Sequence, residues 1–155
     1  MRISYIVIPL ITAAVAVVGS MFTSGGLSSW YGSIAKPSWT PPGSVIGMVW
    51  TTIFILSAIA AIMVWQMAPR DGRFYWTIGL LLLNAILNIL WSYLFFEGHM
   101  IGAAVIEAAL LDITVWVLIA LIWSFSRTAA ILLLPYGLWA AFATYLTFAV
   151  WRLNA

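Results

Sequence analysis

Five long apolar stretches constrain this chain more than any other feature of its sequence. They cover roughly residues 3–22, 44–67, 74–96, 101–123 and 129–151. A helix that rises 1.5 Å per residue needs about 20 apolar residues to cross the ~30 Å hydrocarbon core of a bilayer. Membrane-spanning strands need alternating apolar and polar residues, and these stretches do not alternate. We therefore predict an all-α integral membrane bundle of five transmembrane helices, with residues 1–155 forming one domain.

The composition excludes several other classes of protein. Hydrophobic residues make up 65% of the chain and charged residues 6%, whereas a soluble domain carries about 25% charged residues. The six Lys and Arg residues are scattered, so nucleic-acid binding has no electrostatic basis. The absence of cysteine excludes disulfides and thiolate-ligated metals, and the single histidine, His99, excludes a multi-histidine metal site.

The connecting segments predict how the bundle is oriented. All are short except residues 24–43, which are rich in Gly, Ser and Pro. Five helices place the termini on opposite faces of the membrane. The face of the N-terminus then carries four cations and the other face two; they are Arg2, Arg70, Arg73 and Arg127 against Lys36 and Arg152. The positive-inside rule favours a cytoplasmic N-terminus and an external long loop. The chain shows no internal repeat or pair of broken helices, which argues against a secondary transporter.

Eight of the ten tryptophans lie in the predicted helices, where they fall into two groups. One group lies near the ends of the predicted helices, where indole rings form interfacial belts; it consists of Trp65, Trp76, Trp123 and Trp151. The other group lies deeper and consists of Trp50, Trp91, Trp116 and Trp139. A buried indole N–H needs an acceptor, which lipid tails do not offer.

Several of the predicted helices present aromatic and amide side chains at similar depths towards the long loop. Helical spacing puts Asn84, Asn88, Trp91, Ser92 and Phe95 on one face of the third helix. Residues at a similar depth also come from the first, second and fifth predicted helices; they are Gly19, Trp50, Phe54, Trp139 and Ala143. The two amides could simply clamp neighbouring helices together. We prefer a pocket for a flat apolar ligand with a few polar anchors.

Two acidic residues, Glu107 and Asp112, lie inside the fourth predicted helix. Five positions separate them, so they point about 140° apart and do not form a general acid–base pair on one face. Acidic residues inside a membrane are expensive and suggest function by default. The alternative is that each is protonated or bonded to a neighbouring helix.

Five sequence patterns carry a resemblance to a known family. They are WYGSIAKPSWTPP at 30–42, GMVWT at 47–51, LNAILNILWSYLFF at 83–96, LLPYGLWAAFATYL at 133–146 and VWRLN at 150–154. Together they resemble the TspO/MBR family of tryptophan-rich sensory and translocator proteins, also called the peripheral benzodiazepine receptor family. The patterns follow in register over nearly the whole chain.

The resemblance implies a fold, a ligand class and a site. Members of the family are five-helix bundles, often homodimers, that bind porphyrins, haem-related tetrapyrroles, cholesterol and benzodiazepine-type drugs. Matching positions put Tyr31 and Trp39 in a lid, above a pocket of Trp50, Phe54, Asn88, Trp91, Ser92, Phe95, Trp139 and Ala143. Asn84 joins this set from its spacing, and the secondary candidates are Gly19, Lys36, Glu107, Ala108 and Asp112. Phe148 stands where the cholesterol motif has tyrosine, which departs from the sterol-binding pattern.

The resulting hypothesis is a multi-pass receptor or sensor in a bacterial membrane. A tetrapyrrole lies between Trp50 and Trp139, Asn88 hydrogen-bonds to it, and a propionate reaches Lys36. No resident cofactor or metal is required. Two alternatives remain: light- or oxygen-dependent porphyrin breakdown with Trp50 and Trp139 as the redox groups, and transport assisted by Glu107 and Asp112. A homodimer could form through small residues such as Ala104 and Ala108, although these equally serve packing within one chain.

Overall fold

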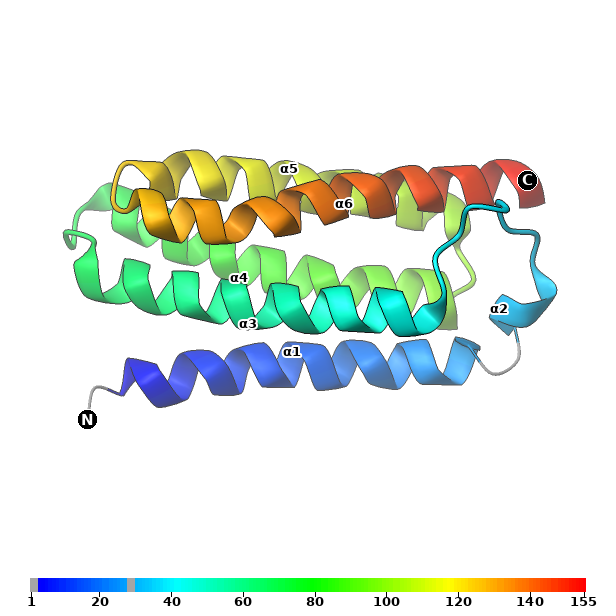
Figure 1. Cartoon of the computed structure of the whole chain (residues 1–155), viewed down its shortest axis with the longest axis horizontal. Helices are drawn as coiled ribbons and strands as arrows, with labels where there is room; N and C mark the ends of the chain where they lie inside the picture. Colours follow the sequence, from blue (N-terminus) through cyan, green and yellow to red (C-terminus); the bar gives the residue numbers. More distant parts are fainter. Residues whose placement is uncertain (1–2, 28–29) are drawn as a thin grey trace.

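A computed structural model describes residues 3–27 and 30–155, and all of the regular structure in those residues is helical (Figure 1). The helices are α1 (Ser4–Leu27), α2 (Trp30–Ser33), α3 (Gly43–Met67), α4 (Gly72–Ser92), the π-helical turn η1 (Tyr93–Glu97), α5 (Ile101–Trp123) and α6 (Arg127–Asn154). Five helical segments, with α4 and η1 forming one of them, are long and apolar enough to cross a membrane. The prediction of an all-α bundle of five transmembrane helices is confirmed.

The boundaries differ from the predicted stretches mainly around the long loop. α1 continues to Leu27, five residues beyond the predicted end at residue 22, although Ser and Gly are weak helix formers. Its last turn stays helical because Gly26 packs directly on Phe96 of η1, where an added Cβ would come within 2.8 Å of Phe96. The loop is correspondingly shorter, and it contains the one-turn helix α2.

The five long helices form a closed ring. Contacts connect α1 to α3, α3 to α6, α6 to α5, α5 to α4, and α4 back to α1. The chain runs up and down, so the two ends lie at opposite ends of the bundle, and α2 lies at the end that holds the C-terminus (Figure 1). Arg70, Arg73 and Arg127 lie in or beside the turns at the N-terminal end. Arg2, the fourth cation of the predicted bias, lies outside the described residues.

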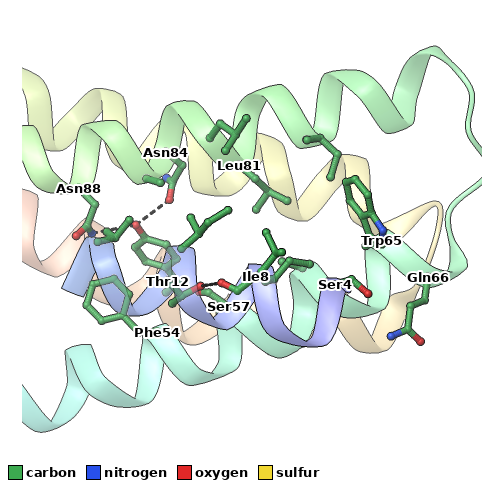
Figure 2. A pocket seen from close by; sticks show the side chains of 18 of the residues that line it. Ser4, Ile8, Thr12, Phe54, Ser57, Trp65, Gln66, Leu81, Asn84 and Asn88 are labelled. Atoms are coloured by element: carbon green, nitrogen blue, oxygen red, sulfur yellow. Dashed lines mark hydrogen bonds between the residues drawn. The ribbon is translucent and has the colours of Figure 1, made fainter. Parts of the chain in front are cut away.

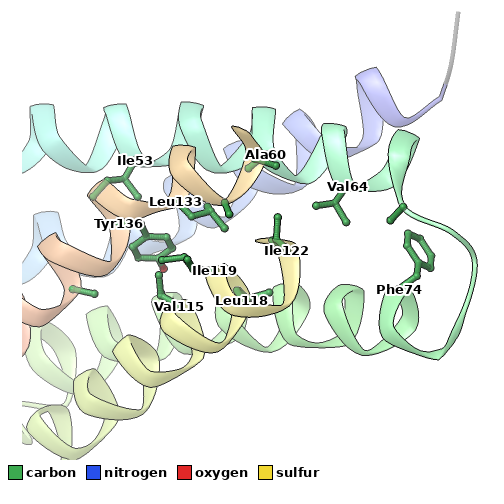
Figure 3. Close-up of a cluster of buried hydrophobic side chains, with 14 residues drawn as sticks. Ile53, Ala60, Val64, Phe74, Val115, Leu118, Ile119, Ile122, Leu133 and Tyr136 are labelled. Carbon is green, nitrogen blue, oxygen red and sulfur yellow. The ribbon is translucent and has the colours of Figure 1, made fainter. Parts of the chain in front are cut away.

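Two clusters of buried apolar side chains hold the bundle together. The larger one joins α3, α5 and α6, and Ile53, Val64, Val115, Ile122 and Leu133 are almost fully buried in it (Figure 3). The smaller one lies under the loop and contains Phe95, Phe96, Ala104 and Val150. Because Ala104 and Ala108 are 0% and 3% exposed, they face the interior of one chain and are not available as a dimer face.

The four tryptophans predicted for interfacial belts all lie near the ends of long helices. Trp76 is 77% exposed, and Trp65, Trp123 and Trp151 are between 37% and 47% exposed. Arg70 lies over the Trp65 ring and Arg127 over the Trp123 ring, with 4.7 Å and 5.9 Å between cation and ring centroid. This arrangement suits a membrane interface, where an indole keeps one side apolar and the other near polar groups.

Candidate ligand site beneath the loop

A cavity of about 870 Å³ lies between the loop and the middle of the bundle. We call it the loop-side cavity, and all five long helices contribute to its walls. Its aromatic lining consists of Tyr31, Trp50, Phe54, Trp91, Phe95, Phe96, Trp139 and Phe142. Gly19, Lys36, Asn88, Ser92, Ala108 and Ala143 also line it. Most of the residues predicted from the sequence are therefore brought together in one cavity.

The local structure of two helices explains how the aromatic rings reach the cavity. On α3, Trp50 and Phe54 are one turn apart and their ring centroids are 5.8 Å apart. On α4, Trp91 stacks on Phe95 with a centroid distance of 5.2 Å and an interplanar angle of 13°. The π-helical turn begins between them, with the Gly98 N–H donating to the Tyr93 carbonyl five residues back. Such a turn inserts one extra residue, which rotates Phe95 and Phe96 into the interior.

Two hydrogen-bond donors in the cavity walls have no partner. The indole N–H groups of Trp91 and Trp139 are buried, and neither finds an acceptor within the described chain. A buried donor without an acceptor costs roughly 1–3 kcal/mol. The protein thus holds two donors in its aromatic walls that it does not satisfy itself.

The amides at the floor of the cavity are already bonded to one another through Tyr136. Asn88 Nδ2 donates to the Tyr136 hydroxyl at 3.2 Å, and that hydroxyl donates to Asn84 Oδ1 at 2.9 Å. Asn84 Nδ2 in turn donates to Thr114 Oγ1 at 2.8 Å. Only Asn88 of the two amides lines the loop-side cavity, so Asn84 lies below the floor and fastens α4 to α5 and α6.

The loop forms a lid that is fixed at several points. Trp30 stacks on His99 at a centroid distance of 4.3 Å, and Tyr31 packs on Phe95 and Phe96. Lys36 Nζ donates to the carbonyl oxygens of Tyr31 and Ile34 at 2.5 Å and 2.9 Å. Burial raises the pKa of the Tyr31 phenol above its ordinary value, so the phenol stays protonated at neutral pH.

The C-terminal end of α6 anchors the same loop. Asn154 accepts from the Ala35 N–H at 3.0 Å through Oδ1 and donates to the Ala35 carbonyl at 2.9 Å through Nδ2. The two residues are 119 positions apart in the sequence. These paired bonds hold the segment between α2 and α3 against the last turn of the chain.

Comparison with known proteins agrees with this architecture. The model of the TspO/MBR family matches residues 6–152. The chain belongs to the TspO/MBR family. It is 38% identical to the tryptophan-rich protein TspO of Bacillus cereus over 81% of both chains, and 36% identical to the membrane protein YtaB of Bacillus subtilis over 92% of this chain and 94% of that one. The human translocator protein is 33% identical over 88% of this chain and 82% of its own length.

Besides Asn84, three residues predicted for the site of this TspO/MBR member lie outside the lining of the loop-side cavity. Trp39 stacks on Tyr145 with centroids 5.4 Å apart and is 44% exposed. Glu107 is 4% exposed, and both of its carboxyl oxygens lack a hydrogen-bond partner within the described residues. Asp112 is half-buried on another face of α5. Ligand contact by these three residues stays a prediction.

Sequence reasoning also missed residues that shape the cavity of this TspO/MBR chain. Phe142 lines it and packs against Trp139 with centroids 5.1 Å apart. Phe142 is three positions after Trp139, so helical spacing contained the signal. Asn154 lies in the VWRLN pattern, but its partner Ala35 is visible only once the chain is folded.

Proposed function

We propose that this protein is a membrane receptor that binds a flat tetrapyrrole of the porphyrin class in the loop-side cavity. The observation that carries the proposal is the pair of unsatisfied indole N–H groups of Trp91 and Trp139, held in a wall of aromatic rings. A tetrapyrrole combines a large π face with polar groups at its edge, and both features match such a wall. The porphyrin is the ligand here, and no resident cofactor is needed.

The dimensions and polar groups of the cavity support the same ligand class. Its volume of about 870 Å³ falls in the range of about 300–1,000 Å³ that small-molecule sites occupy. In the proposed pose the macrocycle lies between Trp50 and Trp139, with Asn88 below it. Lys36 has three N–H donors, and two of them serve the loop carbonyls. We assign the third to a propionate of the ligand.

The test is to measure protoporphyrin binding to the purified protein in the dark, with quenching of tryptophan fluorescence as the signal. We expect saturable binding, with Trp50→Ala and Trp139→Ala each weakening affinity about tenfold because an aromatic contact and its buried area are lost. Trp76→Ala is the matched control, since Trp76 is 77% exposed at the far end of the bundle. Unchanged affinity in the Trp50→Ala, Trp139→Ala double variant would rule out this placement.

Illumination of the same samples tests the alternative of porphyrin breakdown. Trp50 and Trp139 line one cavity, so a bound porphyrin would contact both proposed redox groups. For a receptor we expect the same bleaching spectrum with and without protein. A product that forms only when the wild-type protein is present, and does not form with the Trp139→Phe variant, would favour an enzyme over a receptor. Glu107 and Asp112 line neither of the two large cavities, so no contact seen here supports their role in transport.

We further propose that the N-terminal end of the bundle faces the cytoplasm of a bacterium. The support is the excess of arginine at that end and the bacterial origin of several relatives. Association into a homodimer stays a prediction, and it would have to use a face other than Ala104 and Ala108.

A further inference from the structure

A second cavity, of about 1010 Å³, lies in the half of the bundle that is remote from the loop (Figure 2). We call it the N-terminal-side cavity. It lies between α1, α3 and α4, and most of its lining is apolar. Val15, Phe54 and Asn88 line both cavities and form the wall between them. Nothing in the proposed porphyrin site makes use of this second space.

The N-terminal-side cavity exists because α1 packs unevenly on the rest of the bundle. Towards the loop, Gly26 lets α1 approach Phe96 closely, whereas a Cβ at Gly19 would make only an ordinary contact with Ser92. Towards the N-terminus, the only buried residue of α1 before Val15 is Ser4. The side chains of Val7, Ile8 and Ile11 then line a space instead of filling it.

Polar groups gather at the outer end of this cavity, where Figure 2 shows Ser4, Gln66 and Trp65. Ser4 is 8% exposed, and its hydroxyl has no partner within the described residues. Gln66 Oε1 accepts from the Tyr5 hydroxyl at 3.2 Å, whereas the buried Gln66 Nε2 has no acceptor in the same set of residues. Ser4 opens α1, so no earlier turn of described helix offers a carbonyl to its hydroxyl.

The cation at this end also lacks an anionic partner. Arg70 lines the cavity and donates to the Trp65 carbonyl at 2.6 Å, with its guanidinium 4.0 Å from the Phe74 ring centroid. Over residues 3–27 and 30–155, the ion pair that forms is Arg73 with Asp71 at 3.7 Å. Ser4, Gln66 and Arg70 therefore present donors, and a carboxylate is a group that only accepts.

The length of the N-terminal-side cavity matches a lipid chain. Its lining on α1 extends from Ile3 to Val15, which is roughly 18 Å at 1.5 Å per residue. One leaflet contributes about half of the ~30 Å hydrocarbon core. The cavity thus reaches from the membrane surface to near the midplane. Ser57 lies along its wall, and its buried hydroxyl also has no partner within the described residues, although a helical serine can rotate this group towards a carbonyl of its own helix.

From these observations we infer that the N-terminal-side cavity binds a long-chain fatty acid, with the carboxylate at Ser4, Gln66 and Arg70 and the chain running inwards to Phe54. The charge of Arg70 and the two unsatisfied donors select the head, and the apolar walls hold the tail. This inference does not depend on the porphyrin proposal, because it concerns a different cavity.

The inference is tested with a palmitate analogue that carries a diazirine at the end of its chain. We expect photolabelling of the purified protein to map to α3 near Phe54 and to α4 near Asn84 and Ala85. Ala61→Phe fills the cavity and should abolish labelling, whereas Ile59→Phe, on the lipid-facing side of the same helix, should not. Labelling that is equal in wild type and Ala61→Phe, or that maps elsewhere, would overturn the inference.

A second pair of variants tests the head group and does not rely on filling the cavity. Arg70→Gln should weaken palmitate competition against the probe about tenfold, whereas Arg73→Gln, a cation already paired with Asp71, should leave it unchanged. Hexadecanol or phosphatidylglycerol vesicles that compete as well as palmitate would contradict a carboxylate-specific site. The melting temperature in detergent, measured for each variant, reports whether the bundle is intact.

Discussion

At the scale of single residues, Tyr136 is the polar centre of the bundle. Its hydroxyl links α6 to Asn88 and Asn84 of α4 by hydrogen bonds, and Asn84 in turn donates a hydrogen bond to Thr114 of α5. Tyr136→Phe keeps the ring but leaves two buried amide groups without that partner. We expect it to destabilise the protein by about 1–3 kcal/mol and to lower the melting temperature in detergent by several degrees.

The matched control for that variant is Tyr145→Phe. Tyr145 is on the same helix but is 61% exposed, so loss of its hydroxyl should change the melting temperature little. Bonds between transmembrane helices average only about 0.6 kcal/mol when measured by double-mutant cycles. Equal melting temperatures for Tyr136→Phe and Tyr145→Phe would mean that the bonds of the Tyr136 hydroxyl add nothing to the stability.

The same residues show what spacing can and cannot predict. Placing Asn84 and Asn88 on one helical face was enough to direct both inwards, and both are buried. Counting residues along a helix gives depth but does not identify the neighbour at that depth. The sequence therefore did not reveal that Tyr136 lies between the two amides, or that only Asn88 reaches the loop-side cavity. Trp39 was assigned to the site by family resemblance, and its stacking on Tyr145 depends on the path of the loop.

At the scale of helices, the contact of α1 with η1 sets the shape of both cavities. A Cβ on Gly26 would come within 2.8 Å of both the Cβ and the backbone oxygen of Phe96. Because backbone cannot move aside as a flexible side chain does, Gly26→Ala should cost about 1–3 kcal/mol and push α1 away from η1. Gly25→Ala is the control, since an added Cβ there meets nothing within 4 Å. We would measure melting temperature and porphyrin affinity, and identical values in both variants would refute the argument.

Hydropathy predicted the five long helices well because lipid imposes a length and an apolar composition on each of them. It predicted the ends of the helices less well where contacts between helices determine the residue at which a helix ends. The extension of α1 to Leu27 depends on Phe96, and the π-helical turn depends on how Phe95 and Phe96 pack against the loop. Neither contact is encoded in the periodicity of one segment, so both lay beyond a reading of the sequence alone.

At the scale of the whole molecule, one contact joins the loop to the C-terminal end of the chain. Asn154→Ala removes both bonds to Ala35, each worth about 0.5–1.5 kcal/mol when intact. If the loop is the lid of the porphyrin site, it should open more often. We expect both association and dissociation of protoporphyrin to become about three- to tenfold faster, with a smaller change in affinity, in stopped-flow fluorescence. Arg152→Ala, an exposed neighbour, should leave both rates unchanged.

The orientation of the bundle is also a property of the whole molecule, because it depends on cations brought to one end by two different turns. Arg70, Arg73 and Arg127 lie at the end opposite Lys36 and Arg152, and short loops of this kind determine topology. The chain has no cysteine, so a maleimide that reacts with a single introduced cysteine labels no other site in this protein. In intact spheroplasts, a membrane-impermeant maleimide should label Ser38→Cys in the loop but label Ser124→Cys, in the turn between α5 and α6, only after lysis. Both serines are exposed, so accessibility within the protein is matched. The reverse pattern, or equal labelling of both sites before lysis, would contradict a cytoplasmic N-terminus and would place the fatty-acid carboxylate site at the opposite surface of the membrane.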